Sequence, residues 1–387
     1  MAHAPSPDVA IIGGGIIGCS AAAMLAERGA RVVLFEGSAI GAGASGRNLG
    51  VLQHPFDPVL GTLFHDSLDR YRRLAAEADS GFQLADRPAG LLLLNPDADA
   101  SRAQVRRLAE AVPELAPSFM DPDAVAAAEP ALTPGFAACR LETGYPVPPG
   151  SATAGWARLA ERLGAQVRVG TSAEPSWADG QRVVGVRQSD GEVVAAGTVL
   201  VAAGPSAPPL ADPGGTWQPI TRTWGVTVQV RLGDLAPRHV VEQDEVDAVN
   251  RPARAAERAA ATSEAEPETL FSIASASGVS TLGSTFLPAE PDPDRVAELL
   301  VRRSATYLPA LATAPIVEVR LCARPQSVDG RPFVGRVPWA EGLYVCAGHG
   351  PWGISTGPAS AALIVDALLT GTEARIPLPL RADRAPG

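Results

Sequence analysis

Cysteine pairs are absent from this sequence. The 387 residues contain four cysteines, none of them in a C-x-x-C pair, so neither a zinc knuckle nor a redox dithiol is expected. Scattered cysteines in a chain of this length are typical of a reducing compartment, and we expect a cytoplasmic protein. No Ser/His/Asp triad or metal-ligating cluster stands out, and no metal is expected. The four cysteines are Cys19, Cys139, Cys322 and Cys346.

Long apolar runs and an excess of basic charge are also missing. No apolar run approaches the roughly 20 residues of a membrane span, so no transmembrane segment is expected. The N-terminal stretch MAHAPSPDV lacks Lys and Arg and does not resemble a secretory signal. The net charge is −10, whereas nucleic-acid binding needs a concentrated basic surface. Nucleic acid is therefore not an expected partner.

Glycine, proline and apolar residues are abundant instead. The sequence has 39 glycines and 36 prolines, which indicates many turns and fixed loops. A hydrophobic fraction of 46% is typical of a globular protein. Since 387 residues are too many for one core, we expect two domains or two interleaved lobes.

The N-terminal region has the pattern of a βαβ unit. An apolar strand is predicted at 8–14, a helix at 18–29 and a second strand at 30–37. Gly13, Gly15 and Gly18 form a G-x-G-x-x-G turn, which brings a pyrophosphate to the start of the helix. Glu36 closes the second strand and is placed to accept both hydrogen bonds of a ribose diol. The spacing alone fits either a nicotinamide or a flavin dinucleotide.

Three further glycine-rich segments favour a flavin. The loop GASGRNLGVL at 43–52 allows the backbone to lie flat against a large planar ligand, although an ordinary crossover loop has similar composition. The strand within 198–207 ends in Ala-Gly, where a small residue permits close approach. At 347–368, glycines precede a long helix whose free N–H groups would stabilise the negative charge of a reduced flavin.

The remaining elements place strand-rich sequence between the two glycine-rich ends. We therefore expect a discontinuous cofactor domain and a second domain with an antiparallel sheet. The biased, polar segment 252–268 is expected to be a mobile insertion or lid. Further helices are predicted at 64–80, 101–112, 151–165 and 293–309, and strands at 89–95, 166–171, 182–204 (a hairpin and a buried strand), 224–232, 270–275 and 280–285.

Taken in order, these motifs resemble the FAD-dependent D-amino-acid oxidase superfamily, which includes glycine oxidases, D-amino-acid dehydrogenases and monomeric sarcosine oxidases. The matching segments are IIGGGIIG, Glu36, GASGRNLGVL, VLVAAG, RPQSVDGRPFVG and GHGPWGIS. The resemblance implies an α/β FAD-binding domain (Rossmann-like, of the glutathione-reductase type) and an α+β substrate domain with a mainly antiparallel sheet. We expect the FAD domain at 1–50, 150–210 and 320–375, and the substrate or cap domain at 51–149 and 211–319.

The resemblance also implies a reaction and a cofactor site. A C–H bond next to an amine would give a hydride equivalent to flavin N5, and water would hydrolyse the resulting imine. The substrate would be an amino acid or a secondary amine, and O₂ or another acceptor would reoxidise the flavin. The residues expected to bind FAD are Gly13, Gly15, Ile16, Ile17, Gly18, Glu36, Gly37, Ser45, Gly46, Arg47, Asn48, Gly50, Val51, Leu52, Val167, Ala203, Gly204, Arg324, Gly348, Gly350, Pro351, Trp352, Gly353 and Ile354.

Arg324 is the strongest substrate-binding candidate. In amino-acid oxidases of this superfamily, the arginine of the Arg-Pro motif clamps the substrate carboxylate, which suits a planar guanidinium fork. The charged residues that glycine oxidase and sarcosine oxidase carry near Pro351 and Trp352 are absent here. Trp352 would then either stack on an apolar substrate or pack in the core.

The spacing of Cys322 resembles that of the flavin-linked cysteine of sarcosine oxidase. Noncovalent FAD is nevertheless expected, because enzymes with the Arg-Pro motif usually bind FAD noncovalently.

Three other side chains are weaker candidates. Gln53 and His54 follow the flavin loop and could face the ring, and Tyr145 could line the substrate entrance.

Two alternative functions stay open. A flavoenzyme that oxidises a 2-hydroxy acid would use Arg324 equally well, and a noncatalytic FAD-binding subunit would need no substrate at all.

Overall fold

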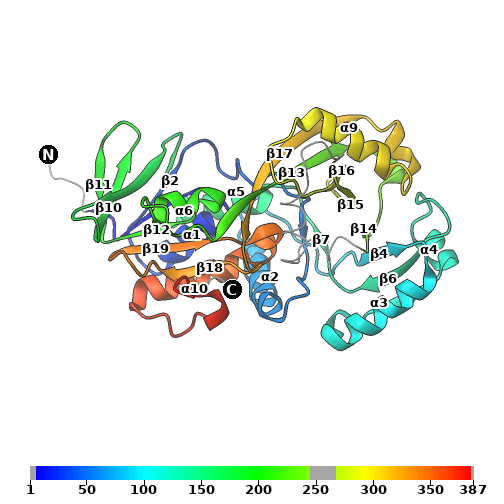
Figure 1. Ribbon diagram of the computed structural model, residues 1–387, viewed down its shortest axis with the longest axis horizontal. Helices are drawn as coiled ribbons and strands as arrows, with labels where there is room; N and C mark the ends of the chain where they lie inside the picture. The colour runs from blue at the N-terminus through cyan, green and yellow to red at the C-terminus, as the bar shows by residue number, and fades with distance from the viewer. Residues whose placement is uncertain (1–5, 245–266, 385–387) are drawn as a thin grey trace.

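A six-stranded sheet forms the first of two lobes in the computed structural model, which describes residues 6–244 and 267–384 (Figure 1). β1 and β2 pair in parallel, and β1 also pairs in parallel with β12, as the N-terminal βαβ pattern predicts. The strand at one edge, β18, is antiparallel to β19. The order is β18 (Phe333–Arg336), β19 (Leu343–Ala347), β12 (Thr198–Val201), β1 (Val9–Ile12), β2 (Val32–Glu36) and β8 (Gln166–Val169).

Four helices pack together beside this sheet. α1 (Ile16–Glu27) lies against α5 (Ser151–Arg162) and α10 (Gly353–Thr370), and α10 lies against α2 (Pro58–Ala76). By length and composition, 350–370 could cross a membrane, with a mean hydropathy of 1.3, which the sequence did not predict. Most of this stretch is buried between neighbouring helices, so core packing accounts for its apolar composition.

A small three-stranded sheet and a short helix complete the first lobe. β9 (Ala173–Trp177), β10 (Val183–Gln188) and β11 (Val193–Ala195) are antiparallel, and β10 and β11 form the expected hairpin. α6 (Ala207–Ala211) contributes to the core formed with this hairpin and the adjacent strands. The C-terminal strand–turn–helix thus returns beside the N-terminal unit, as a discontinuous cofactor domain requires.

An eight-stranded sheet forms the second lobe (Figure 1). Its pairs are antiparallel except for β14 with β4, which is parallel. α9 (Pro293–Ser304) and α3 (Ala98–Ala111) pack on it, and α4 (Pro122–Ala128) lies near its β5–β6 edge. The strand order is β17 (Ile316–Ser327), β13 (Ile220–Val230), β16 (Val279–Thr285), β15 (Thr269–Ala276), β14 (Val240–Gln243), β4 (Leu91–Asn95), β6 (Ala137–Leu141) and β5 (Ser118–Met120).

Two elements lie differently from the sequence expectation. α2 was expected in the substrate domain and six residues later, but it starts at Pro58 because the Asp57 side chain caps it, and it packs on α10. β17 begins in the expected cap and continues into the expected FAD segment, yet the strand it pairs with in its sheet is β13; near its end, Gln326 forms a single bridge with His349. The sequence did not predict β5, β6 or α4. Most of the expected lid at 252–268 lies outside the described residues.

Candidate functional site

A large cavity lies at the carboxyl ends of the parallel strands. It has a volume of about 370 Å³ and is lined by residues at the ends of β1, β2, β12 and β19. In open α/β sheets, ligands bind at this edge, where the loops leave the strands. The first residues of both α1 and α10 also line the cavity. The two glycine-rich ends of the chain therefore form one site.

The glycines of the N-terminal turn are required by close backbone packing. A Cβ at Gly18 would lie 1.9 Å from the carbonyl oxygen of Gly13. Gly13 itself has φ +116°, and a Cβ there would lie 2.5 Å from the carbonyl oxygen of Ala202. The backbone N–H of Ile16 donates to Ser45 Oγ at 3.0 Å, which joins the flavin-type loop to the start of α1. This turn can hold a pyrophosphate against backbone N–H groups.

Glu36 is held at one end of the cavity by backbone N–H groups. Gly14 donates to its Oε2 and Ser38 donates to its Oε1, each at 2.8 Å. A carboxylate oxygen accepts more than one hydrogen bond, so both oxygens retain capacity for ribose hydroxyls. The carboxyl group is thus oriented before any ligand binds.

The other end of the cavity contains a buried polar atom without a protein partner. Among the described residues, His349 Nε2 has no hydrogen-bond partner, although the side chain is only 3% exposed. Burial lowers the pKa of His349 to about 3, so its ring is neutral at pH 7. His349 lines the cavity beside the glycine turn that opens α10. An unpaired ring nitrogen here fits a site built for a polar ligand.

The loop at 43–52 is fixed to strand β17 by two arginines. Arg320 donates from Nη1 to the Gly46 carbonyl at 3.3 Å and from Nη2 to the Asn48 carbonyl at 3.1 Å. In return, Arg47 Nη1 donates to the Leu321 carbonyl at 2.9 Å. These contacts hold the loop against the strand that also carries Cys322 and Arg324.

Arg324 lies where the larger cavity meets a second one of about 100 Å³. Its guanidinium donates from Nη1 to the Thr285 carbonyl at 2.6 Å and lies over the Phe286 ring, 4.6 Å from the centroid. No carboxylate pairs with it within the described part of the chain. Burial lowers the pKa of Arg324, which nevertheless stays charged at neutral pH. This cation can bind an anionic ligand group.

The second cavity also carries a carboxyl group. Glu242 lines it and is 5% exposed; its Oε2 accepts from Gln53 Nε2 at 3.3 Å, and its Oε1 accepts from Ser272 Oγ at 3.1 Å. Gln53, Pro351 and Trp352 line the same cavity. The second cavity therefore combines one cationic side chain, one carboxyl group and three aromatic rings, those of Phe56, Phe286 and Trp352.

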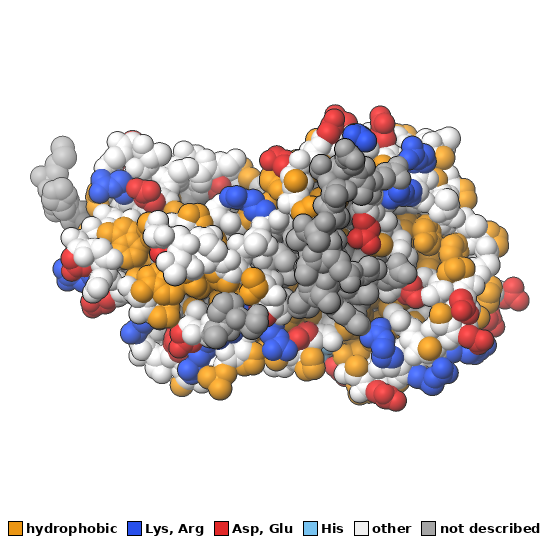
Figure 2. Space-filling model, in the orientation of Figure 1, with side chains coloured by type: hydrophobic (Ala, Val, Ile, Leu, Met, Phe, Trp, Pro, Cys, Tyr) orange, Lys and Arg blue, Asp and Glu red, His pale blue; other side chains and the backbone are white. Residues whose placement is uncertain are grey.

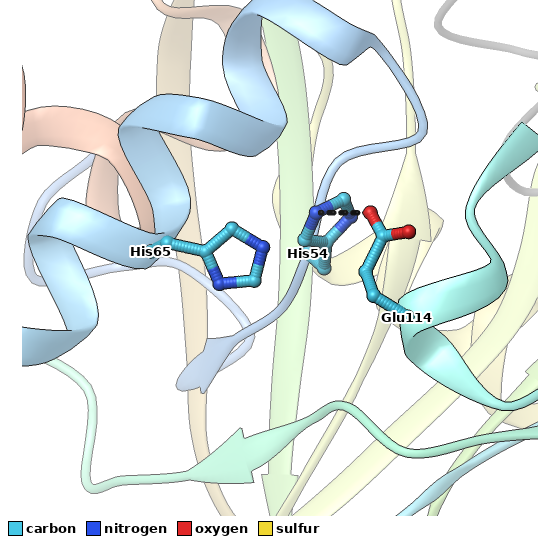
Figure 3. A group of neighbouring side chains, drawn as sticks. All are labelled: His54, His65 and Glu114. Atoms are coloured by element: carbon cyan, nitrogen blue, oxygen red, sulfur yellow. Dashed lines mark ion pairs between the residues drawn. The ribbon is translucent and has the colours of Figure 1, made fainter.

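His54 and Tyr145, two of the candidates, line neither cavity. Gln53 faces the second cavity, while the His54 ring lies beside His65 and Glu114 (Figure 3). Burial, and secondarily His65, lower the pKa of His54 to about 4, although Glu114 acts in the opposite direction. Tyr145 is buried in the pairing of β7 (Tyr145–Pro146) with β3 (Val51–Leu52).

Most of the other candidates border one of the two cavities, and the rest border neither. The structure brings to the larger cavity Gly13, Gly15, Ile16, Ile17, Glu36, Gly37, Ser45, Asn48, Ala203, Gly204, Arg324, Gly350, Pro351, Gly353 and Ile354. Val51 and Trp352 border the second cavity. The candidates that border neither are Gly18, Gly46, Arg47, Gly50, Leu52, Val167 and Gly348.

Sequence reasoning missed several cavity residues. Ser172 was not singled out, although its position soon after β8 is a usable signal, and Ala202 and Ser206 were not named as site residues within the predicted segment 198–207. Glu242 was missed too, and its signal is a single acidic residue within the buried run VVEQ. Thr227 and Ser284 have no comparable signal, because the sheet pairing that brings them to the second cavity is long-range.

Comparison with known proteins identifies the family. Residues 8–367 match the family of FAD dependent oxidoreductases. The chain belongs to this family. It is 29% identical to the glycine oxidase of Pseudomonas aeruginosa, an alignment that covers 95% of this chain and 96% of the relative. The crystal structure of glycine oxidase from Bacillus cereus superposes with a TM-score of 0.80 at 25% identity, covering 98% of this chain and 99% of that one.

A more distant structure shares the fold. Iminodiacetate oxidase from Chelativorans sp. BNC1 has a TM-score of 0.79 at 22% identity, covering 96% of this chain and 98% of that one. The expected function, an FAD-dependent oxidoreductase of the amino-acid and amine oxidase type, is confirmed at the level of the family. FAD is the cofactor, and the two helix N-termini, Glu36 and the unpaired His349 nitrogen fit it.

Proposed function

We propose that this enzyme oxidises the C–N bond of a carboxylate-bearing amine, an amino acid or a secondary amino acid, to an imine. The observation that carries the proposal is Arg324, a cation without a described carboxylate partner at the junction of the two cavities. A guanidinium fork binds a carboxylate through two parallel hydrogen bonds, which fixes the reacting carbon. Bound FAD supplies the chemistry by accepting a hydride equivalent from the carbon next to the amine.

Several residues that line the second cavity have a role in the proposed reaction. Arg324 orients the substrate carboxylate, and the Phe286 ring together with the Thr285 carbonyl fixes the direction of the guanidinium. Glu242 and Gln53 face the amine end, where a carboxyl group accepts hydrogen bonds from an amine. Trp352 and Pro351 cover apolar parts of the substrate and exclude water.

The names of the relatives support the same substrate class. The Pseudomonas relative is a glycine oxidase and the Chelativorans structure is an iminodiacetate oxidase. Their named substrates each carry a carboxylate and an amine nitrogen. A cavity of about 100 Å³ beside Arg324 favours a small substrate of this kind.

We further propose that FAD is bound noncovalently and that the protein is cytoplasmic. Cys322 lines the FAD cavity, but burial raises the pKa of its thiol, although Arg324 and two other arginines lower it in part. A thiol is a poor nucleophile until it loses its proton. All four cysteines are free, which fits a reducing compartment.

We also propose a finer assignment of the fold. A glutathione-reductase type FAD domain, interrupted by a substrate domain, is supported by the strand order of the six-stranded sheet and by the single parallel pair in the eight-stranded one. O₂ or another electron acceptor would reoxidise the flavin.

We do not propose nucleic acid as a partner. On the face shown in Figure 2, acidic and basic side chains are interspersed, and the net charge is −10. That distribution gives no concentrated basic surface on this face for a phosphate backbone.

One experiment separates the proposal from its two alternatives. Purified holoenzyme is incubated with amino acids, N-alkyl amino acids and 2-hydroxy acids, and flavin reduction is followed together with release of ammonia or amine. Reduction coupled to ammonia or amine release supports C–N oxidation. Reduction by 2-hydroxy acids without ammonia identifies the hydroxy-acid enzyme, and a flavin that no compound reduces favours a noncatalytic subunit.

A further inference from the structure

Two of the five histidines in the sequence lie close together, outside both the larger cavity and the second cavity beside Arg324. His54 precedes helix α2, His65 lies on α2, and Glu114 lies in the short 3-10 helix η1 (Pro113–Leu115) (Figure 3). One ligand atom from each of the three residues lies within 4.8 Å of the others. The distance between His54 Nε2 and Glu114 Oε1 is 3.7 Å.

His54 is buried, yet its ring nitrogens form no hydrogen bond with the described residues. The side chain is 2% exposed, and neither Nδ1 nor Nε2 has a hydrogen-bond partner among the described residues. Buried ring nitrogens are normally paired, so this pair of unsatisfied atoms needs a ligand or a water. The ring is wedged against Gly61, where a Cβ would lie 2.9 Å from His54 Nε2, and it meets Phe64 edge-on.

We infer that His54, His65 and Glu114 form a binding site for a divalent transition-metal ion. Two imidazoles and a carboxylate suit Zn²⁺, Ni²⁺ or Cu²⁺, whereas Mg²⁺ and Ca²⁺ prefer oxygen ligands. Three protein ligands leave the remaining position of a tetrahedral ion to water. The family match and the relatives' names assign no metal to this chain, and the sequence alone did not predict one.

The geometry needs only the exposed members to move. Around a tetrahedral Zn²⁺, with bonds of about 2.0–2.2 Å, ligand atoms lie roughly 3.4 Å apart. The three ligand atoms, which lie within 4.8 Å of one another, must therefore move closer together when the ion binds. His65 is exposed and the Glu114 side chain is 47% exposed, so both can rotate toward the fixed His54 ring.

The three residues of the site come from both lobes. α2 packs on α10 in the first lobe, whereas η1 follows α3, which packs on β6 of the eight-stranded sheet. His54 also follows Gln53, which lines the second cavity. A bound ion would cross-link the two lobes beside the substrate chamber and stabilise the folded protein by mass action.

The test uses FAD-loaded protein without an affinity tag and Zn²⁺ as the probe. Calorimetric titration measures stoichiometry and affinity, and thermal unfolding with and without Zn²⁺ gives a second readout. His65→Ala and Glu114→Gln each remove one exposed ligand and leave the core unchanged. Glu110→Gln is the matched control, because Glu110 is an exposed glutamate on nearby α3 and lies outside the cluster.

We expect one Zn²⁺ per chain in the wild type and a rise in its unfolding temperature. Each ligand variant should bind at least about tenfold more weakly, since even changes outside the first ligand shell cost that much, and should lose the thermal shift. The control should behave as the wild type. Absence of saturable binding to the wild type, equal binding by His65→Ala, or an equal loss in Glu110→Gln would each overturn the inference.

Discussion

The guanidinium of Arg324 lies over the ring of Phe286, with the Arg324 Cζ atom 4.6 Å from the ring centroid. The same side chain donates to the Thr285 carbonyl, so it is held from two sides, and no second hydrogen bond from its guanidinium is found among the described residues. Gly225 makes this position available, because a Cβ there would lie 2.3 Å from Arg324 Nη1. The arrangement presents a fixed cation at the border of the two cavities.

Replacement of Arg324 by alanine should therefore impair substrate use far more than folding. A charged, bidentate pair in a partly desolvated site is worth several kcal/mol, so kcat/KM should fall by about a hundredfold or more. Arg324→Lys should restore activity only in part, because lysine lacks the planar fork. Steady-state kinetics test this, with the exposed Arg231→Ala as the control. A similar kcat/KM in the wild type and the alanine variant would mean that Arg324 is structural.

Glu36→Ala should weaken retention of FAD. The substitution removes the acceptors for the ribose diol and leaves the backbone N–H groups of Gly14 and Ser38 without their described partner. Loss of such charged hydrogen bonds costs on the order of 2–3 kcal/mol. Flavin content after dilution and gel filtration measures the effect, with Glu27→Ala on the exposed side of α1 as the control. Equal flavin content in the two variants would show that Glu36 does not hold the ribose.

Acid precipitation should release the flavin. Burial raises the pKa of the Cys322 thiol, which disfavours the thiolate needed to attack the flavin ring. We expect yellow FAD in the supernatant for both the wild type and Cys322→Ala. Colour that stays in the wild-type pellet and leaves it in Cys322→Ala would prove a covalent bond and contradict this prediction.

Stability should fall on acidification, partly because of His349. Its pKa is about 3 in the folded protein and has an ordinary value of 6.5 when unfolded. Unfolding therefore takes up a proton below pH 6.5, and the free energy of unfolding decreases as the pH falls from 6.5 toward 3. Between pH 6.5 and 5 this amounts to about 2 kcal/mol. Urea unfolding of holoprotein at both pH values should show a smaller loss for His349→Asn. Equal losses would show that the ring accepts a proton in the folded state.

The candidate FAD-binding cavity could largely be anticipated from the sequence because its signals are local. Gly13, Gly15 and Gly18 lie in one turn, and Glu36 ends the next strand at the expected position. The steric need for Gly18 can be inferred from the motif alone, and the 1.9 Å approach to Gly13 agrees with it. The family match confirms the cofactor that these motifs predicted.

The substrate chamber and the histidine cluster were not predictable in the same way. Glu242 meets Gln53 across 189 residues of chain, and Glu114 reaches His54 from a 3-10 helix after α3. No local pattern encodes either contact. His54 was expected near the flavin because it follows the loop, but adjacent residues of an extended chain point to opposite sides. Gln53 therefore faces the second cavity, while His54 faces α2.

Anaerobic reduction of the bound flavin by matched substrates tests the central claim most directly. Holoenzyme is mixed without oxygen with a panel of amino acids and N-alkyl amino acids and with their carboxamides, and the loss of flavin absorbance is followed. We expect that at least one carboxylate-bearing amine bleaches the wild type rapidly, that its carboxamide does so poorly, and that Arg324→Ala shows little difference between the two. Bleaching by simple amines or carboxamides as fast as by carboxylates, or by no amine at all, would contradict it.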